Sequence, residues 1–132
     1  MTFNTDKTSY VIFHSPNKKL LDTIKIKFGK RIISRTNSVK FLGVLLDEIV
    51  NWTTHLVELS KKLARTVGIF YKLRHYVPLD ALKSIYFALF YPFLTYGIVV
   101  WGATHDNYLR PVLTSQKKVI RAITCKHLSL AM

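Results

Sequence analysis

The chain has 132 residues, of which 49% are hydrophobic, and 20 Lys and Arg against 7 Asp and Glu give it a formal net charge of +13. This length and apolar content are typical of one globular domain, or a piece of a larger one, and exclude wholesale disorder. The basic excess favours a polyanionic partner, nucleic acid before an anionic membrane surface; a basic globular domain without such a partner is the alternative. Cys125 is the only cysteine, and the first residues are polar, so we expect no disulfide framework, no signal peptide and an intracellular location, nuclear or cytoplasmic.

The first part of the chain, residues 1–50, is predicted to be rich in β-strands. Ser9 to His14 is a β-type run that ends at the turn signal Ser15-Pro16-Asn17. Thr23 to Phe28 alternates apolar and basic residues, which predicts a half-buried strand with a basic outer face. Gly29-Lys30 then makes a tight hairpin link to Arg31–Ser34. Because the runs are close together along the chain, an antiparallel meander is favoured over crossover connections.

The stretch from Val39 to Asp47 is a fourth strand-like run, with Gly43 near its middle. A glycine inside a strand has no side chain to pack, so it often marks a bend or a close approach of the backbone to another group. Asn51 and Trp52 follow, and the periodicity then becomes helical. We therefore expect the binding site to lie near this change from strands to helices.

The segment from Trp52 to Arg74 has a helical period with two distinct faces. One face is apolar, within about 80° on a helical wheel, and is formed by Leu56, Leu59, Leu63, Val67 and Phe70. The opposite face is basic and is formed by Lys61, Arg65 and Lys72. Such a basic face is either a solvated helix surface or a contact surface for phosphates.

A second helix is predicted from about Leu79 to Tyr91, after Pro78. It is apolar nearly all round, which places it in the middle of a bundle, and Pro92 is expected to kink or end it. Ser84 to Ala103 contains no charged residue and is long enough to raise the alternative of a membrane span. Because proline and glycine interrupt the segment, a buried helix followed by a short second element is favoured.

The last helix is predicted from about Leu109 or Pro111 to Thr124. Its apolar side is formed by Leu109, Val112, Leu113, Val119, Ile120 and Ile123. Its basic side is formed by Arg110, Lys117 and Arg121, with Lys118 at the flank. The sequence thus predicts an α+β fold, with a small N-terminal antiparallel β-sheet in residues 1–50 and a mainly helical region in residues 51–132.

No catalytic constellation is recognisable. The five histidines are scattered, and Cys125 with His127 lacks the second pair that a tetrahedral metal site needs. Asp47-Glu48 is the only adjacent pair of carboxylates, and neighbours on a strand point in different directions. A glycine-rich phosphate loop and a nucleophile elbow are both absent from the sequence. We therefore expect this chain alone to be non-catalytic, with no metal or other cofactor of its own.

Six short motifs, in order along nearly the whole chain, carry a family resemblance. They are Asn4-Thr5-Asp6-Lys7-Thr8 before Val11-Ile12-Phe13; Val39-Lys40-Phe41-Leu42-Gly43-Val44; Asn51-Trp52-Thr53-Thr54-His55; Gly68-Ile69-Phe70-Tyr71-Lys72-Leu73-Arg74; Tyr91-Pro92-Phe93-Leu94-Thr95-Tyr96-Gly97 with Trp101-Gly102; and Gln116-Lys117-Lys118-Val119-Ile120-Arg121. Together they resemble the reverse transcriptase (RNA-directed DNA polymerase) of non-LTR, LINE-type retrotransposons of the jockey or CR1 kind, in the region after the catalytic strands.

The resemblance implies a role for each part of the chain. Lys7 would lie near the phosphates of the incoming nucleotide. Phe41, Leu42 and Gly43 would form the primer grip at the end of the palm, a hairpin that holds the 3′ end of the primer. The helices would form the thumb, which closes on an RNA–DNA or DNA duplex irrespective of sequence. The implied nucleic-acid contacts are Lys61, Arg65, Lys72, Lys117, Lys118 and Arg121.

The departures from the family pattern are also informative. The Tyr-x-Asp-Asp carboxylates that hold the metal ions, Mg²⁺ by expectation, would lie before Met1, as would the fingers and the rest of the palm. The chain is therefore expected to be a fragment whose missing partners are those parts of the polymerase. Pro111 stands where the family continues a helix, so we expect that helix to start later here. The alternatives are a protein-interaction or membrane-associated module built on residues 84–103, and a decayed reading frame without function.

Overall fold

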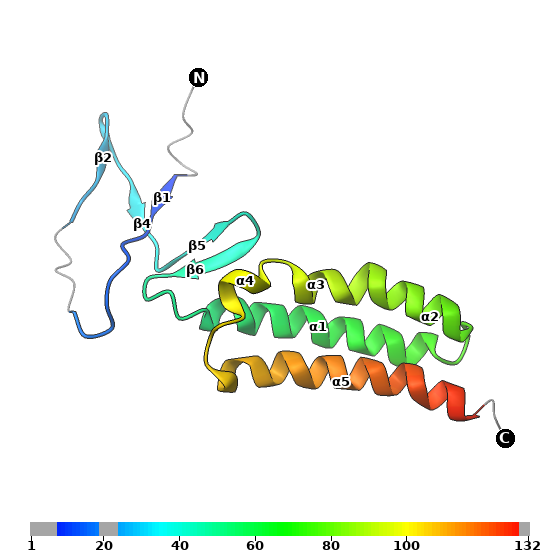
Figure 1. Cartoon of the computed structure of the whole chain (residues 1–132). Helices are drawn as coiled ribbons and strands as arrows, with labels where there is room; N and C mark the ends of the chain where they lie inside the picture. The colour runs from blue at the N-terminus through cyan, green and yellow to red at the C-terminus, as the bar shows by residue number, and fades with distance from the viewer. Residues whose placement is uncertain (1–7, 19–23, 130–132) are drawn as a thin grey trace. The chain divides into compact units, whose positions relative to one another are not determined.

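The structure is a computed structural model that describes residues 8–18 and 24–129 (Figure 1). The chain divides into two compact units, Met1–Thr54 and His55–Met132, and each is described by itself below. Short strands occupy the first unit and helices the second, so the predicted α+β fold class is confirmed. Among the described residues, no helix is both long enough and apolar enough to cross a membrane.

The first unit contains three separate two-stranded ladders. Their strands are β1 (Ser9–Tyr10), β2 (Lys27–Phe28), β3 (Arg31–Ile32), β4 (Ser34–Arg35), β5 (Ser38–Phe41) and β6 (Val44–Asp47). The hairpin predicted at Gly29-Lys30 is confirmed: β2 and β3 pair antiparallel, and Gly29 has the positive φ, +62°, that glycine tolerates without a Cβ clash. The β5–β6 pair is antiparallel as well, whereas β1 pairs with β4 in parallel, so the predicted meander is wrong at that pair.

Two strand predictions in this unit need correction. The segment before the first hairpin is not half-buried, because Ile24, Ile26 and Phe28 are 50%, 41% and 52% exposed. Alternation along a strand shows only that one face could be buried; burial also requires a second layer to cover it. The run from Val39 to Asp47 is not the single strand that its apolar pattern indicated, but it is the hairpin that the family resemblance implied: β5 and β6 pair antiparallel, with Leu42 and Gly43 in the turn.

A partly buried ion pair joins distant parts of the first unit. The Arg35 guanidinium donates a 2.8 Å hydrogen bond to the Glu48 carboxylate, and both side chains are largely buried. His14 Nε2 lies 3.5 Å from the other Glu48 oxygen, and the His14 amide donates to the Glu48 carbonyl oxygen. Glu48 therefore holds together the strand that contains Arg35 and the loop that follows β1.

The helical unit begins with α1 (Thr53–Leu73), whose predicted apolar face is confirmed. Leu56, Leu59, Leu63, Val67 and Phe70 are all buried. The Asn51 side chain accepts a hydrogen bond from the Thr53 amide, which satisfies one of the free donors at the start of the helix. The helix ends at Leu73, before the segment His75–Pro78, as predicted.

The next helical stretch is continuous but changes its hydrogen-bond register. It consists of α2 (Leu79–Ile85), the π-helical turn η2 (Tyr86–Phe90) and α3 (Tyr91–Thr95). The Tyr91 amide donates to the Tyr86 carbonyl, five residues earlier. This wider turn directly precedes Pro92, which lacks an amide hydrogen, so the stretch passes through the proline instead of ending at it.

The prediction that this stretch lies in the middle of a bundle is wrong. Only Leu82, Phe90 and Leu94 are buried, whereas Phe87 is 61% exposed. Leu89, Tyr91 and Phe93 are exposed too. An apolar sequence on all sides of a helix permits full burial but does not supply the neighbours that would provide it.

A left-handed residue separates α3 from α4 (Ile98–Trp101). Gly97, the residue before α4, has φ +68°, a left-handed conformation that glycine adopts without strain. Trp101 is buried at the end of α4, and the centroid of its ring lies 6.0 Å from the centroid of the His55 ring on α1. This contact ties the short helix to the core of the unit.

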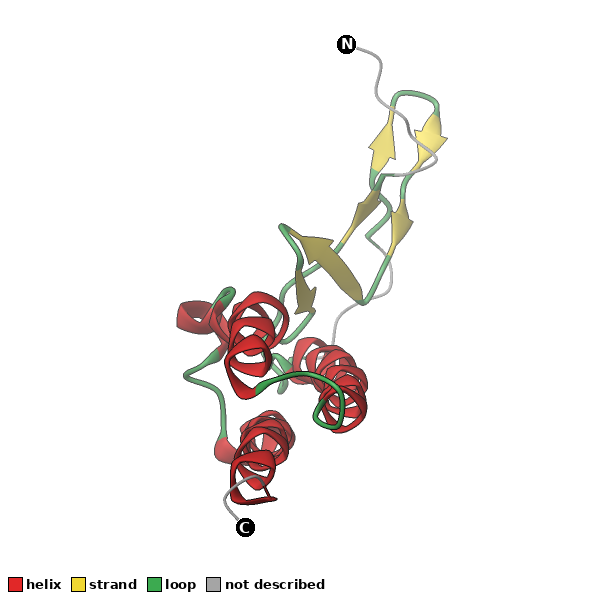
Figure 2. Cartoon of the chain, turned by 90° about the vertical axis from the view of Figure 1, so that its right-hand side faces the viewer, coloured by secondary structure: helices red, strands yellow, loops and turns green. Residues whose placement is uncertain are grey.

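The last helix, α5 (Asp106–Ser129), is longer than predicted. It starts before Pro111 and not after it, so the proline lies inside the helix, where its missing amide hydrogen leaves one internal hydrogen bond, to the Asn107 carbonyl oxygen, unmade. Val112, Val119 and Ala122 are buried, but Leu113 and Ile120 are 50% and 48% exposed, so the predicted apolar side is correct only in part. Figure 2 shows these helices as a bundle, and Figure 1 shows α1 alongside α5.

Candidate functional site

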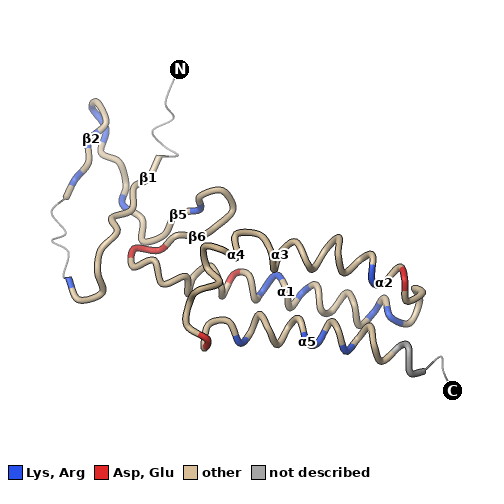
Figure 3. Tube along the Cα trace, viewed as in Figure 1, with Lys and Arg blue, Asp and Glu red and all other residues tan. Residues whose placement is uncertain are grey.

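Basic residues recur along α1 and α5 (Figure 3). The helical unit contains three carboxylates in its sequence, Glu58, Asp80 and Asp106. The six residues expected to contact nucleic acid are all exposed: Lys61, Arg65, Lys72, Lys117, Lys118 and Arg121. The two helices therefore present positive charge to the solvent with few neighbouring acids to neutralise it.

A groove of about 500 Å³ runs between α1 and α5. Lys61 lines it from α1, and Arg110 and Lys118 line it from α5. The other expected contacts, on both helices, are not among the residues that line this groove. The structure thus brings two of the six expected residues together with a third cation, Arg110, that the expected set omitted.

Arg110 could have been found from its spacing. Arg110, Thr114 and Lys118 recur every four residues, so they lie in a row on one face of α5. The sequence placed Arg110 on the basic side of this helix but gave no sign of what lies opposite. Only the packing of α1 against α5 shows that Lys61 shares the groove with it.

Hydroxyl groups and small side chains form the rest of the groove. Ser60, Ala64, Pro111, Thr114 and Ser115 line it between the cations. The Ser115 hydroxyl donates a 3.0 Å hydrogen bond to the Pro111 carbonyl oxygen. The Ser60 Oγ is buried and has no hydrogen-bond partner within the described chain. The groove therefore combines positive charge with polar donors.

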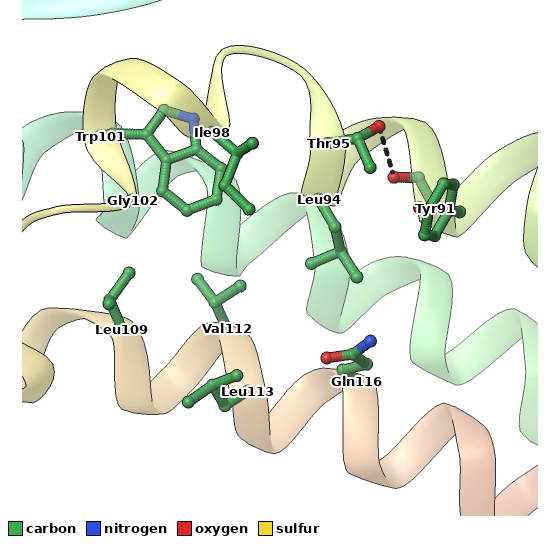
Figure 4. Close-up of a pocket in the computed structure, with 10 residues that line it drawn as sticks. All are labelled: Tyr91, Leu94, Thr95, Ile98, Trp101, Gly102, Leu109, Val112, Leu113 and Gln116. Carbon is green, nitrogen blue, oxygen red and sulfur yellow. Dashed lines mark hydrogen bonds between the residues drawn. The ribbon is translucent and has the colours of Figure 1, made fainter.

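A second cavity, of about 310 Å³, has a different character (Figure 4). It is lined mainly by apolar side chains of α3, α4 and α5: Tyr91, Leu94, Thr95, Ile98, Trp101, Gly102, Leu109, Val112, Leu113 and Gln116. None of these described lining residues is charged. The cavity is thus unsuited to a phosphate and suited to an apolar group.

The β5–β6 hairpin places the expected primer-grip residues at its tip. Phe41 and Leu42 are 61% and 74% exposed. Leu42 and Gly43 both have positive φ, 46° and 83°, as the two central residues of a type I′ turn require. Gly43 adopts this conformation without strain, whereas it is unusual for a leucine. Lys7, the expected nucleotide-phosphate contact, lies outside the described residues.

No arrangement in the described part of the chain suggests catalysis or metal binding. The described residues contain no group of three or more His, Cys, Asp or Glu side chains that could hold a metal ion. His55 is buried beside Trp101; burial, followed by the charge of Lys62, lowers the pKa of His55 below its usual value of 6.5. His55 is therefore a core histidine whose charged form is disfavoured by its surroundings.

Comparison with known proteins identifies sequence relatives. One is named "Probable RNA-directed DNA polymerase from transposon X-element" of Drosophila melanogaster; it is 30% identical over 95 residues, covering 70% of this chain and 10% of the relative. The chain is homologous to transposon RNA-directed DNA polymerases. A second such polymerase, from the mobile element jockey of Drosophila funebris, is 25% identical over 127 residues, or 94% of this chain. The jockey polymerase of Drosophila melanogaster is 25% identical over 103 residues.

The homologous region is a small part of each transposon polymerase. The chain matches 10%, 14% and 11% of the lengths of these three relatives. No family model matches the chain. No solved structure matches it either. The resemblance to reverse transcriptases of non-LTR retrotransposons is thereby supported at the level of the polymerase family.

Proposed function

We propose that this chain is the part of a retrotransposon RNA-directed DNA polymerase that grips a template–primer duplex, and that it binds RNA–DNA or DNA duplexes irrespective of sequence. The observation that carries the proposal is the exposed positive charge on α1 and α5, in a chain homologous to polymerases of this kind. Nucleic-acid backbones carry a regular array of phosphates, so cations along two adjacent helices suit them without reading bases.

In this proposal the helical unit acts as the thumb and the β5–β6 hairpin as the primer grip. Lys61, Arg65, Lys72, Lys117, Lys118 and Arg121 contact phosphates. Phe41, Leu42 and Gly43 meet the 3′ end of the primer; the exposure of this tip and the glycine in its turn leave the backbone accessible. Lys7 lies near the incoming nucleotide.

Catalysis belongs to the complete polymerase in this proposal. The carboxylates that would hold Mg²⁺ lie outside this chain, together with the fingers and the remaining palm, which are its partners in the polymerase. The chain alone then binds a duplex without extending the primer. Nucleotide incorporation by the purified chain in the presence of Mg²⁺ would contradict this part of the proposal.

The binding itself is tested with fluorescently labelled duplexes. The affinity of the purified chain for a mixed-sequence RNA–DNA hybrid and for a DNA duplex is measured by anisotropy at several salt concentrations. If six cations contact phosphates, the logarithm of the affinity falls with the logarithm of the salt concentration with a slope of about −5. Two hybrids of unrelated sequence should bind about equally. An affinity that does not change with salt, or that depends strongly on sequence, would contradict the proposal.

A further inference from the structure

The groove between α1 and α5 has cations on both of its walls. Arg110, Thr114 and Lys118 form one wall, as a cation, a hydroxyl and a second cation at four-residue spacing. Lys61 faces the groove from α1. Ala64 has only a methyl group, which leaves the space between the walls open. Two helices far apart in the sequence thus form one positively charged recess.

No carboxylate in the described part of the chain neutralises these three cations. Among the described residues, none that lines the groove is acidic, and none of the three cations forms an ion pair with a carboxylate. Like charges in one recess repel one another, and an anion placed between them is attracted by all three. A single phosphate group can accept hydrogen bonds from several donors at once.

The Ser60 hydroxyl adds a separate observation. Ser60 is one of the residues that line the groove, but its Oγ is buried, so the hydroxyl reaches the groove only after a rotation of the side chain; in the structure it has no hydrogen-bond partner in the described chain. A serine within a helix ordinarily donates to the carbonyl four residues earlier, as Ser115 does to Pro111. A buried hydroxyl without a partner costs stability, which a ligand that accepts its hydrogen bond would restore.

We propose that the α1–α5 groove holds one backbone phosphate of the bound nucleic acid, between Lys61 on one wall and Arg110 and Lys118 on the other, with the hydroxyls of Ser60 and Thr114 as further donors. This inference rests on the proposed duplex binding and names the site within it. Since none of the described groove residues is aromatic, the groove offers no surface for base stacking, and it reads the backbone alone. Arg65, Lys72, Lys117 and Arg121 then act outside this site.

The central test compares two triple variants of equal charge. The groove variant carries Lys61→Gln, Arg110→Gln and Lys118→Gln. The control variant carries Lys30→Gln, Lys62→Gln and Lys83→Gln, three exposed lysines that do not line the groove. The groove variant should lose about tenfold or more in affinity for the RNA–DNA hybrid, and its salt slope should become shallower by about 1. The control variant should lose much less, with an unchanged slope.

Two further variants separate binding from folding. Lys61→Arg with Arg110→Lys and Lys118→Arg keeps the charge and should keep the affinity near that of the unchanged chain. Ser60→Ala removes the buried hydroxyl; it should weaken binding about threefold while leaving stability equal or higher, because an unsatisfied donor is lost. If Ser60→Ala lowers the stability of the chain and leaves its affinity for the duplex unchanged, the Ser60 hydroxyl is not part of the phosphate site.

The outcomes distinguish this inference from the function on which it rests. If the unchanged chain binds duplexes with the expected salt dependence but the two Gln variants bind alike, the groove proposal is overturned and the proposed function stands. If the unchanged chain does not bind duplexes at all, both are overturned. The phosphate site is supported if only the groove variant loses affinity for the duplex and the charge-conserving variant keeps it.

Discussion

The indole Nε1 of Trp101 donates a 3.0 Å hydrogen bond to the carbonyl oxygen of Tyr96. Tyr96 ends α3 with an extended backbone, and Gly97 then turns the chain with φ +68°. Because Trp101 is only 2% exposed and packs beside His55 of α1, one side chain both closes this turn and fills the core. The α3–α4 connection is therefore held by a specific bond, although its sequence is apolar throughout.

Replacing this indole tests the bond directly. Trp101→Phe keeps an aromatic ring but removes the donor and some volume, so the free energy of unfolding should fall by about 1–3 kcal/mol. Urea unfolding followed by helical circular dichroism measures the change. Val99→Ala is the matched control on the same short helix, since Val99 is 92% exposed, and it should change stability by less than about 0.5 kcal/mol. Equal effects of the two substitutions would mean that the Trp101 bond contributes nothing.

Two glycines should respond in opposite directions to alanine. A Cβ at Gly102 would overlap the Ile98 carbonyl oxygen, so Gly102→Ala forces the backbone to shift and should destabilise the helical unit by about 1–3 kcal/mol. A Cβ at Gly68, within α1, meets no atom within 4 Å apart from its chain neighbours and the nearby backbone of the same helix. Gly68→Ala should therefore stabilise the unit by about 0.5–1 kcal/mol, because alanine loses less entropy in a helix. Thermal unfolding of both variants checks the two signs.

The buried His55 should make stability depend on pH. Its folded pKa lies below 6.5, chiefly through burial, so below about pH 6.5 the unfolded chain binds the proton more readily than the folded chain. Above about pH 6.5, the titration of His55 should therefore not change the stability of the helical unit. As the pH falls from about 6.5 toward the folded pKa, the stability should decrease. His55→Gln removes this titration, so the difference in unfolding free energy between the two chains should shrink as the pH is lowered through that range. A difference that is independent of pH would contradict the assignment.

The Arg35–Glu48 pair should matter more than an exposed pair. Glu48→Gln leaves a largely buried guanidinium without its carboxylate and should destabilise the first unit by about 1–3 kcal/mol. Hydrogen exchange at the His14 and Thr36 amides, which bond to Glu48 and Tyr10 carbonyls, reports on this unit. Asp80→Asn is the control: Asp80 is exposed and lies 3.9 Å from the Lys83 ammonium, so its loss should change stability by less than about 0.5 kcal/mol. Unaltered exchange in Glu48→Gln would show that the pair is not stabilising.

Local sequence patterns correctly predicted those elements that depend on the spacing of apolar residues along a helix or on the residues of a tight turn. The spacing of Leu56, Leu63 and Phe70 was enough to predict a helix and its buried face. The pair Gly29-Lys30 was enough to predict a hairpin turn. The same patterns did not predict which apolar side chains are buried. Phe87 lies on a helix that is apolar on all sides, and Ile26 lies in a segment that no second layer covers, so both are exposed.

The sequence by itself determined the α+β class, the two-faced α1 and the basic character of the helices, because charge and helical period are properties of the local chain. It also carried the motifs that relate this chain to transposon polymerases. Only the tertiary structure decided that Lys61 shares a groove with Arg110 and Lys118, that β1 pairs in parallel with β4, and that the aromatic stretch around Phe87 faces outward. Each of these depends on which elements pack together, and contacts between residues far apart in the chain leave no periodic trace in one sequence.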